Sequence, residues 1–124
     1  MIILDTSVVI EYLKGNQKII EIVDEYSKKS AIGIAYISEY ELLKYFDKKL
    51  VIENFIRNIT VVYPDHTSAA RSAEIYRRLR NSGNLINEHD ILIAGIALNN
   101  QNKFITLDSD LTQINDSNIY IVNI

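Results

Sequence analysis

The sequence contains no cysteine among its 124 residues. This absence excludes a disulfide framework and a metal site built from thiolates. No apolar run approaches the roughly 20 residues that a membrane-spanning helix needs, because the longest run extends only from Ile91 to Leu98. Asp5 and Glu11 interrupt the first apolar stretch and no basic leader precedes it. We therefore expect no signal peptide and a cytoplasmic location.

Positive charge is also scarce. The chain has 13 Lys and Arg against 16 Asp and Glu, which gives a net charge of −3. This balance argues against a nucleic-acid partner held by bulk charge alone. A cluster of acids that binds cations would explain part of the deficit, because a bound metal ion reverses the local sign of charge. With 48% hydrophobic residues, the length suits one core, and we expect a single domain over residues 1–124.

Short apolar or β-branched runs alternate with segments of helical period. The predicted strands span residues 2–4, 31–36, 60–63, 103–107 and 119–122. The predicted helices span about residues 8–13, 17–29, 37–46, 48–58, 65–82 and 88–100, with Gly15, Gly83 and Asn87 as end signals. This alternation is typical of an α/β domain. We expect a three-layer α/β/α sandwich with a central, mostly parallel sheet.

Four acidic residues stand beside apolar segments. Asp5 ends the first predicted strand and Asp108 follows the strand at 103–107, whereas Glu41 and Asp90 lie on predicted helices. Carboxylates are rarely buried without a partner, so the four together indicate a hard divalent cation with oxygen ligands. Ligands of open parallel sheets bind beyond the carboxyl ends of the strands. We expect the four carboxylates to meet there and at least one pKa to be raised by mutual repulsion.

Each acid also has a purely structural explanation. Asp5 can be only a helix N-cap, and Asp90 can be only a first-turn acid favoured by the helix dipole. Glu41 can pair with Lys44 or Lys48 on a solvated face. Three further sets of residues have ordinary structural explanations as well. They are His89 as a supporting or surface histidine, Asp110 and Asp116 as turn or capping residues, and Arg71, Arg77 and Arg78 as a solvated stripe or as phosphate contacts.

Four segments, in order, resemble those of a known family. They are Ile3-Leu4-Asp5-Thr6-Ser7, Ile37-Ser38-Glu39-Tyr40-Glu41-Leu42, Asp90-Ile91-Leu92-Ile93-Ala94-Gly95-Ile96-Ala97 and Ile105-Thr106-Leu107-Asp108-Ser109-Asp110-Leu111. Over essentially its whole length the chain resembles a PIN domain, most closely the VapC-type toxin ribonucleases of type II toxin–antitoxin pairs. Gly95 replaces a usual alanine and Leu111 a usual phenylalanine. Glu41 is preferred to Glu39 because the family places Ser or Thr three residues before the acid, as Ser38 is here.

The resemblance implies a Mg²⁺- or Mn²⁺-dependent endoribonuclease that hydrolyses RNA phosphodiester bonds. The implied catalytic residues are Asp5, Glu41, Asp90 and Asp108, with Asp5 and Asp90 as the principal metal ligands. Thr6 and Thr106 would hold these carboxylates, a water or a phosphate oxygen. Members of the family are usually homodimers, and a cognate antitoxin usually inhibits them by laying a segment over the acidic groove.

Two alternatives remain open. A phosphoacceptor receiver domain also has strand-end acids, but it needs paired acids after the first strand and a lysine after the last strand. Here Asp5 stands alone and the last strand ends without lysine; Asp65 could mimic the central acid, but Asp90 would be unexplained. The second alternative is a catalytically silent PIN-like module that binds RNA or a protein. A nuclease assay with and without Mn²⁺ separates it from an enzyme.

Overall fold

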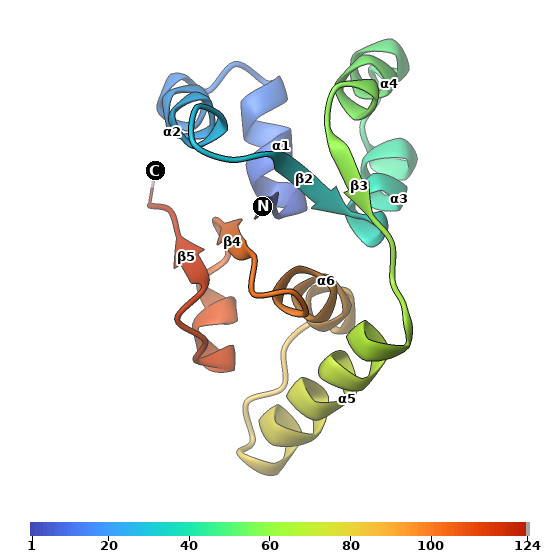
Figure 1. Ribbon diagram of the computed structural model, residues 1–124, viewed down its shortest axis with the longest axis vertical. Helices are drawn as coiled ribbons and strands as arrows, with labels where there is room; N and C mark the ends of the chain where they lie inside the picture. The colour runs from blue at the N-terminus through green and yellow to red at the C-terminus, as the bar shows by residue number, and fades with distance from the viewer. Residues whose placement is uncertain (124) are drawn as a thin grey trace.

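A fully parallel sheet of five strands forms the centre of the computed structural model, which describes residues 1–123 (Figure 1). The strands are β1 (Ile2–Leu4), β2 (Ile32–Ala35), β3 (Thr60–Val62), β4 (Lys103–Thr106) and β5 (Ile119–Ile121). The helices are α1 (Thr6–Leu13), α2 (Gln17–Ser27), α3 (Tyr36–Tyr45), α4 (Lys49–Arg57), α5 (His66–Asn81), α6 (Glu88–Leu98) and the 3₁₀ helix η1 (Ser109–Ile114). The predicted α/β class is confirmed, and every strand pair is parallel.

The strand order is β3-β2-β1-β4-β5. From β1 the chain builds β2 and β3 on one side and then crosses to β4 and β5 on the other side. The order therefore reverses between β1 and β4, whose residues Leu4 and Ile105 lie opposite each other. In parallel sheets this reversal leaves a crevice at the carboxyl ends of the two strands. The fold thus places the ends of β1 and β4 where a ligand site is expected.

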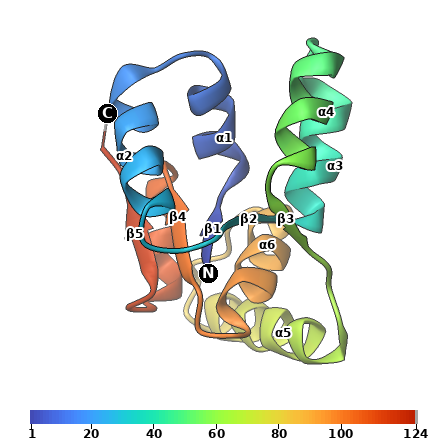
Figure 2. The same ribbon diagram turned by 45° about the horizontal axis from the view of Figure 1, so that its top comes forward.

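Two hydrophobic clusters, one on each face of the sheet, make up the core. Side chains alternate along a strand, so Ile2 and Leu4 point to one face and Ile3 to the other. The first face is covered by α1, α2, α3 and α4, and the second by α5, α6 and η1 (Figure 2). The three-layer arrangement is confirmed. No helix within residues 1–123 is both long enough and apolar enough to cross a membrane.

The boundaries of the predicted elements lie within two residues of the observed ones. Gly15 and Gly83 take positive φ values of +87° and +75° just after α1 and α5, as expected for glycines that end helices. The strand predicted to reach Tyr36 stops one residue earlier, because Ala35 is already the N-cap of α3. The helix η1 was not predicted from the sequence, because its single short run lacks a clear helical period.

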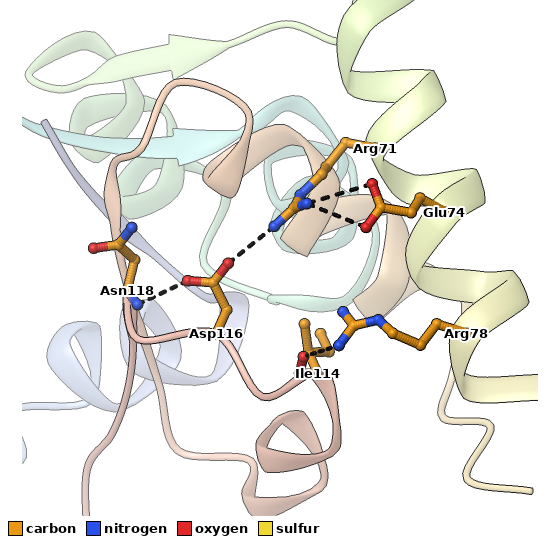
Figure 3. A network of polar contacts seen from close by, with 6 residues as sticks. All are labelled: Arg71, Glu74, Arg78, Ile114, Asp116 and Asn118. Carbon is orange, nitrogen blue, oxygen red and sulfur yellow. Dashed lines mark hydrogen bonds and ion pairs between the residues drawn. The ribbon is translucent and has the colours of Figure 1, made fainter. Parts of the chain in front are cut away.

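The arginines of α5 form the expected solvated, ion-paired face only in part (Figure 3). Arg77 and Arg78 are exposed and Arg71 pairs with Glu74 at 3.4 Å, but Arg71 and Arg78 also contact a distant segment. Arg71 Nη2 lies 2.9 Å from Asp116 Oδ2, and Arg78 Nη1 donates to the Ile114 carbonyl at 2.8 Å. Asp116 Oδ1 also accepts from the backbone N–H of Asn118 at 2.8 Å, which makes Asp116 a turn residue as predicted. These contacts attach the segment after η1 to α5. Sequence spacing alone could not reveal them, because the partners are distant along the chain.

Candidate functional site

The four acids predicted to form a site line one cleft of about 810 Å³. Asp5 directly follows β1 and Asp108 lies two residues beyond β4, so both stand at the strand-order reversal. Glu41 comes from α3 and Asp90 from the first turn of α6. Residues that are far apart in the sequence are thus brought to one place by the parallel topology.

Asp5 is held by three donors and is only 4% exposed. Its Oδ1 accepts from the Thr6 N–H at 2.9 Å, so Asp5 is the N-cap of α1. Its Oδ2 accepts from the Thr106 hydroxyl at 2.6 Å, and the Ser7 hydroxyl lies 3.4 Å away. Burial raises the pKa of Asp5, although the hydrogen bonds from Thr106 and Thr6 act in the opposite direction. The capping role and a place in the acidic cluster therefore belong to the same residue.

Asp90 is the second acid of the cleft whose pKa is raised. Its pKa is raised from 3.8 to about 7, first by burial and then by the negative charges of Asp5, Asp108 and Glu41. A hydrogen bond with Asp108 also stabilises the protonated form of Asp90. The expectation that mutual repulsion raises at least one carboxyl pKa is confirmed. Near neutral pH the cluster holds a proton where a metal ion could supply positive charge instead.

Glu41 is connected to the cluster through Thr6. The Thr6 hydroxyl donates to Glu41 Oε1 at 2.6 Å and lies 2.9 Å from the hydroxyl of buried Ser38. Since a carboxylate only accepts and Thr6 has a single hydroxyl proton, Ser38 must be the donor in the second contact. The serine three residues before the acid thus helps to fix Thr6. His89 Nδ1 lies 3.2 Å from Glu41 Oε2, which makes His89 a supporting residue.

The choice of Glu41 over Glu39 agrees with the geometry. Glu39 lines a separate shallow hollow on the outer side of α3 and does not face the acidic cleft. Within residues 1–123, Glu41 makes no ion pair with Lys44 or Lys48, so the solvated-face explanation of Glu41 is wrong.

Thr106 joins the two strand-end acids. Its hydroxyl donates to Asp5 and accepts from the backbone N–H of Asp108 at 3.0 Å. Asp108 is itself the N-cap of η1, because its Oδ1 accepts from the Asp110 N–H at 2.9 Å. Asp110, predicted to be a turn or capping residue, lies in the first turn of η1, and the cap is Asp108. The buried hydroxyl of Thr106 therefore connects the Asp5 carboxylate to the backbone of Asp108.

Sequence reasoning missed three residues that line or support the cleft. Ser7 Oγ accepts from the Leu107 N–H at 3.3 Å and so ties the start of α1 to the end of β4. Lys14 and Lys48 line the same cleft at a distance from the acids. The position of Ser7 beside Asp5 was a usable signal, but nothing in the sequence relates Lys14 to Lys48.

The donor set suits a hard divalent ion. Within residues 1–123, no three acidic or histidine side chains converge closely enough to form a ready-made metal cage. Mg²⁺, however, keeps several waters and needs only one or two carboxylates from the protein. No Lys or Arg of the described residues forms an ion pair with any of the four acids. Oxygen donors with uncompensated negative charge therefore fit such an ion, with water completing its coordination.

The comparisons with known proteins agree with this geometry. The family model described as PIN domain matches residues 2–116. The fold is similar to that of VapBC-1 from nontypeable Haemophilus influenzae, with a TM-score of 0.84, 23% identity and 98% of each chain covered. It is also similar to VapBC2 from Rickettsia felis bound to a promoter DNA fragment, with a TM-score of 0.81, 19% identity and coverage of 99% of this chain and 98% of that chain. A toxin–antitoxin complex from Klebsiella pneumoniae gives a TM-score of 0.80 at 14% identity, covering 98% of this chain and 100% of that chain. No curated protein matches the sequence.

Proposed function

The chain belongs to the PIN domain family, and from that membership we propose that it is a metal-dependent endoribonuclease and the toxin of a toxin–antitoxin pair. One observation carries the proposal. Four carboxylates from β1, α3, α6 and β4 line one cleft, and the pKa values of Asp5 and Asp90 are raised there. A site of this kind gains stability from a cation, which is also what phosphodiester hydrolysis requires.

Asp5 and Asp90 would hold Mg²⁺ or Mn²⁺, and Glu41 and Asp108 would complete the cluster directly or through water. When bound, such an ion supplies an activated water and neutralises charge on the phosphate. The protein contributes orientation. Thr106 fixes one oxygen of Asp5 and the Thr6 N–H fixes the other, so the Asp5 carboxylate cannot rotate freely. Thr6 holds Glu41 in the same way through its hydroxyl.

The test is cleavage of single-stranded RNA by the purified protein, with Mn²⁺ or with excess EDTA. We expect cleavage only with metal, and loss of cleavage in Asp5→Asn and Asp90→Asn. Glu39→Gln is the matched control, because Glu39 is a neighbouring acid on α3 that does not line the cleft. Robust cleavage in EDTA, or full activity of Asp90→Asn, would contradict the proposal.

The same assay tests the alternative of a catalytically silent PIN-like module, which would bind RNA or a protein but would not cut RNA with or without metal. The receiver-domain alternative is set aside, because the chain belongs to another family and its strand order is β3-β2-β1-β4-β5. Asp65, the acid that could mimic a central phosphoacceptor, is an exposed N-cap of α5. Its pKa is lowered by the Ser68 N–H that it accepts from.

The proposal includes a cognate antitoxin that silences the enzyme by placing a basic side chain among the four acids. It is supported by the uncompensated acids and by the similar structures, which are VapBC and toxin–antitoxin complexes. Co-expression with the protein of the neighbouring gene should give a complex of low nuclease activity. Replacement of the inserted Arg or Lys should restore cleavage.

We also propose a cytoplasmic homodimer. Exposed apolar side chains gather on the outer side of α3, where Tyr36, Tyr40 and Leu43 are 43–50% exposed, and Tyr63 lies against Tyr36 with ring centroids 5.6 Å apart. Contiguous apolar surface of this kind is typical of an interface. Sedimentation of the wild type and of Tyr40→Glu tests the dimer, and a monomeric wild type would contradict it.

A further inference from the structure

The acidic cleft continues beyond the acids along one face of α1. The residues of this wall recur at helical spacing and are Thr6, Ser7, Ile10, Leu13 and Lys14. Because an α-helix rises about 1.5 Å per residue, the step from Asp5 to Lys14 spans about 14 Å. Lys14, the C-cap of α1, therefore lies at the far end of the cleft from Asp5.

The opposite wall has the same polarity. It runs from α3 into the connection to α4 and contains Glu41, Leu42, Tyr45, Phe46, Asp47 and Lys48. Figure 2 shows α1 on one side and α3 with α4 on the other, both rising from the sheet. On each wall the acids of the cluster come first, apolar or aromatic residues follow and a lysine stands at the end, with Asp47 next to Lys48 on the second wall. We call the part beyond the four acids, lined by Ile10, Leu13, Lys14, Tyr45, Phe46, Asp47 and Lys48, the basic arm, because its two lysines outnumber its one acid.

The helix ends at which the two lysines stand explain the presence of Lys14 but not of Lys48. A cation at the C-cap of α1 is favoured by the helix dipole, which accounts for Lys14. Lys48 stands at the N-cap of α4, where a cation is disfavoured, and it makes no capping hydrogen bond. Within residues 1–123 neither lysine forms an ion pair. The two lysines, which form no ion pair among the described residues, therefore line opposite walls of one cleft, in a chain whose net charge is −3.

We infer that the basic arm binds single-stranded RNA, with Lys14 and Lys48 contacting phosphates on one side of the bond to be cut. This inference rests on the proposed function. Tyr45 is 66% exposed on the same wall and offers a flat face on which a base can stack. The arm ends about 14 Å from the acids, which corresponds to about four nucleotides at roughly 3.4 Å per stacked nucleotide. The lysines thus overcome the repulsion that the acids exert on an approaching polyanion.

The experiment measures RNA binding by fluorescence anisotropy in EDTA, with Asp90→Asn as the background so that no cleavage occurs. In this background Lys14→Gln/Lys48→Gln is compared with Lys28→Gln/Lys29→Gln, a control of equal charge outside the cleft. For the cleft pair we expect Kd to rise roughly tenfold, because each lost phosphate contact costs about threefold at moderate salt. The slope of log Kd against log salt should fall by about 1.4. The control pair should leave both quantities near the parent values.

Substrate length gives a second readout that a merely structural role would not change. A short RNA that extends fewer than about four nucleotides from the acids cannot reach the lysines at the end of the arm. The lysine effect on KM, measured with metal in the otherwise wild-type enzyme, should therefore be present on a long RNA and absent on a short one, with kcat unchanged on both.

The experiments distinguish a failure of this inference from a failure of the proposed function. If the protein with metal cuts no RNA, the proposed function is wrong, while lysine-dependent binding in the Asp90→Asn background would still support the RNA contact. If RNA is cut but the cleft pair matches the control pair in Kd and salt slope, the inference is overturned. It is also overturned if the cleft pair binds RNA normally and instead loses its complex with the partner protein.

Discussion

Replacement of Asp90 by asparagine should stabilise the metal-free protein at alkaline pH. The change keeps the shape of the side chain and removes the charge that Asp5, Asp108 and Glu41 oppose. The rise in the pKa of Asp90 from 3.8 to about 7 corresponds to about 4 kcal/mol for a fully buried group, at about 1.4 kcal/mol per pH unit. Asp90 is only partly buried, so solvent screening reduces this to about 1–2 kcal/mol.

The direction of this pH dependence follows from the linkage between proton binding and folding. The folded carboxyl of Asp90 holds its proton up to about pH 7, whereas the unfolded one loses it near pH 4. The free energy of unfolding of the wild type should therefore fall as pH rises from 4 to 7 and then level off. Asp90→Asn should show a much flatter profile. It should match the wild type near pH 4 and exceed it by about 1–2 kcal/mol at pH 8.

Urea unfolding followed by circular dichroism, in EDTA at pH 4.5, 6 and 8, measures this difference. Asp110→Asn is the matched control, because Asp110 is an exposed acid near the same site whose charge is not among the causes of the pKa shift of Asp90. The control should keep the pH profile of the wild type. An Asp90→Asn protein that is less stable than the wild type at pH 8, or that keeps the same pH slope, would refute a shared acidic site.

Three further predictions concern the same site and the helix behind it. Saturating Mn²⁺ should reverse the fall of wild-type stability with rising pH, because the ion binds only the folded site; at an Mn²⁺ concentration one hundred times its Kd, the free energy of unfolding should rise by about 2.7 kcal/mol. Identical melting profiles with and without Mn²⁺ would show that the acids do not hold an ion. Thr106→Val keeps the shape of the side chain but removes the hydroxyl that donates to Asp5 at 2.6 Å, so the pKa of Asp5 should rise further and Mn²⁺ affinity, measured by calorimetry, should fall about 10–100-fold; Thr60→Val on exposed β3 is its control. Gly95→Ala should lower the free energy of unfolding by about 1–2 kcal/mol in urea, because the new Cβ would lie 1.8 Å from the Ser72 Oγ and 2.9 Å from the Ser72 Cβ, and this overpacking outweighs the gain in helix propensity. Adding Ser72→Gly should reduce that loss. Unaltered stability of Gly95→Ala alone would contradict the close packing of α5 on α6.

Gly95 shows a limit of prediction from the sequence alone. The sequence identified Gly95 as a departure from the alanine usual in the resembling family, but gave no reason. The reason lies on another helix. Ser72 of α5 occupies the space where the alanine methyl would be, and its hydroxyl donates to the Ile91 carbonyl at 3.3 Å. The partner of a small residue is set by helix packing and not by local spacing.

The sequence by itself determined the fold class, the element types and the four candidate acids. Strands and helices have periods of two and 3.6 residues, and apolar patterns carry these periods directly. Asp5 and Asp108 could be placed at one edge of the sheet because parallel strands end on the same side. The order of the motifs supplied Glu41 and Asp90, and the nearby Ser38 favoured Glu41 over Glu39.

Only the tertiary structure decided how these acids behave and what surrounds them. The raised pKa of Asp90 depends on burial and on charges contributed by three other elements, and no local pattern contains either. The same holds for the Thr106 hydroxyl on Asp5, for His89 beside Glu41, and for two lysines that share one cleft. Electrostatic interactions act through space between residues distant in the chain, so the sequence specifies the charges and the fold sets their effect.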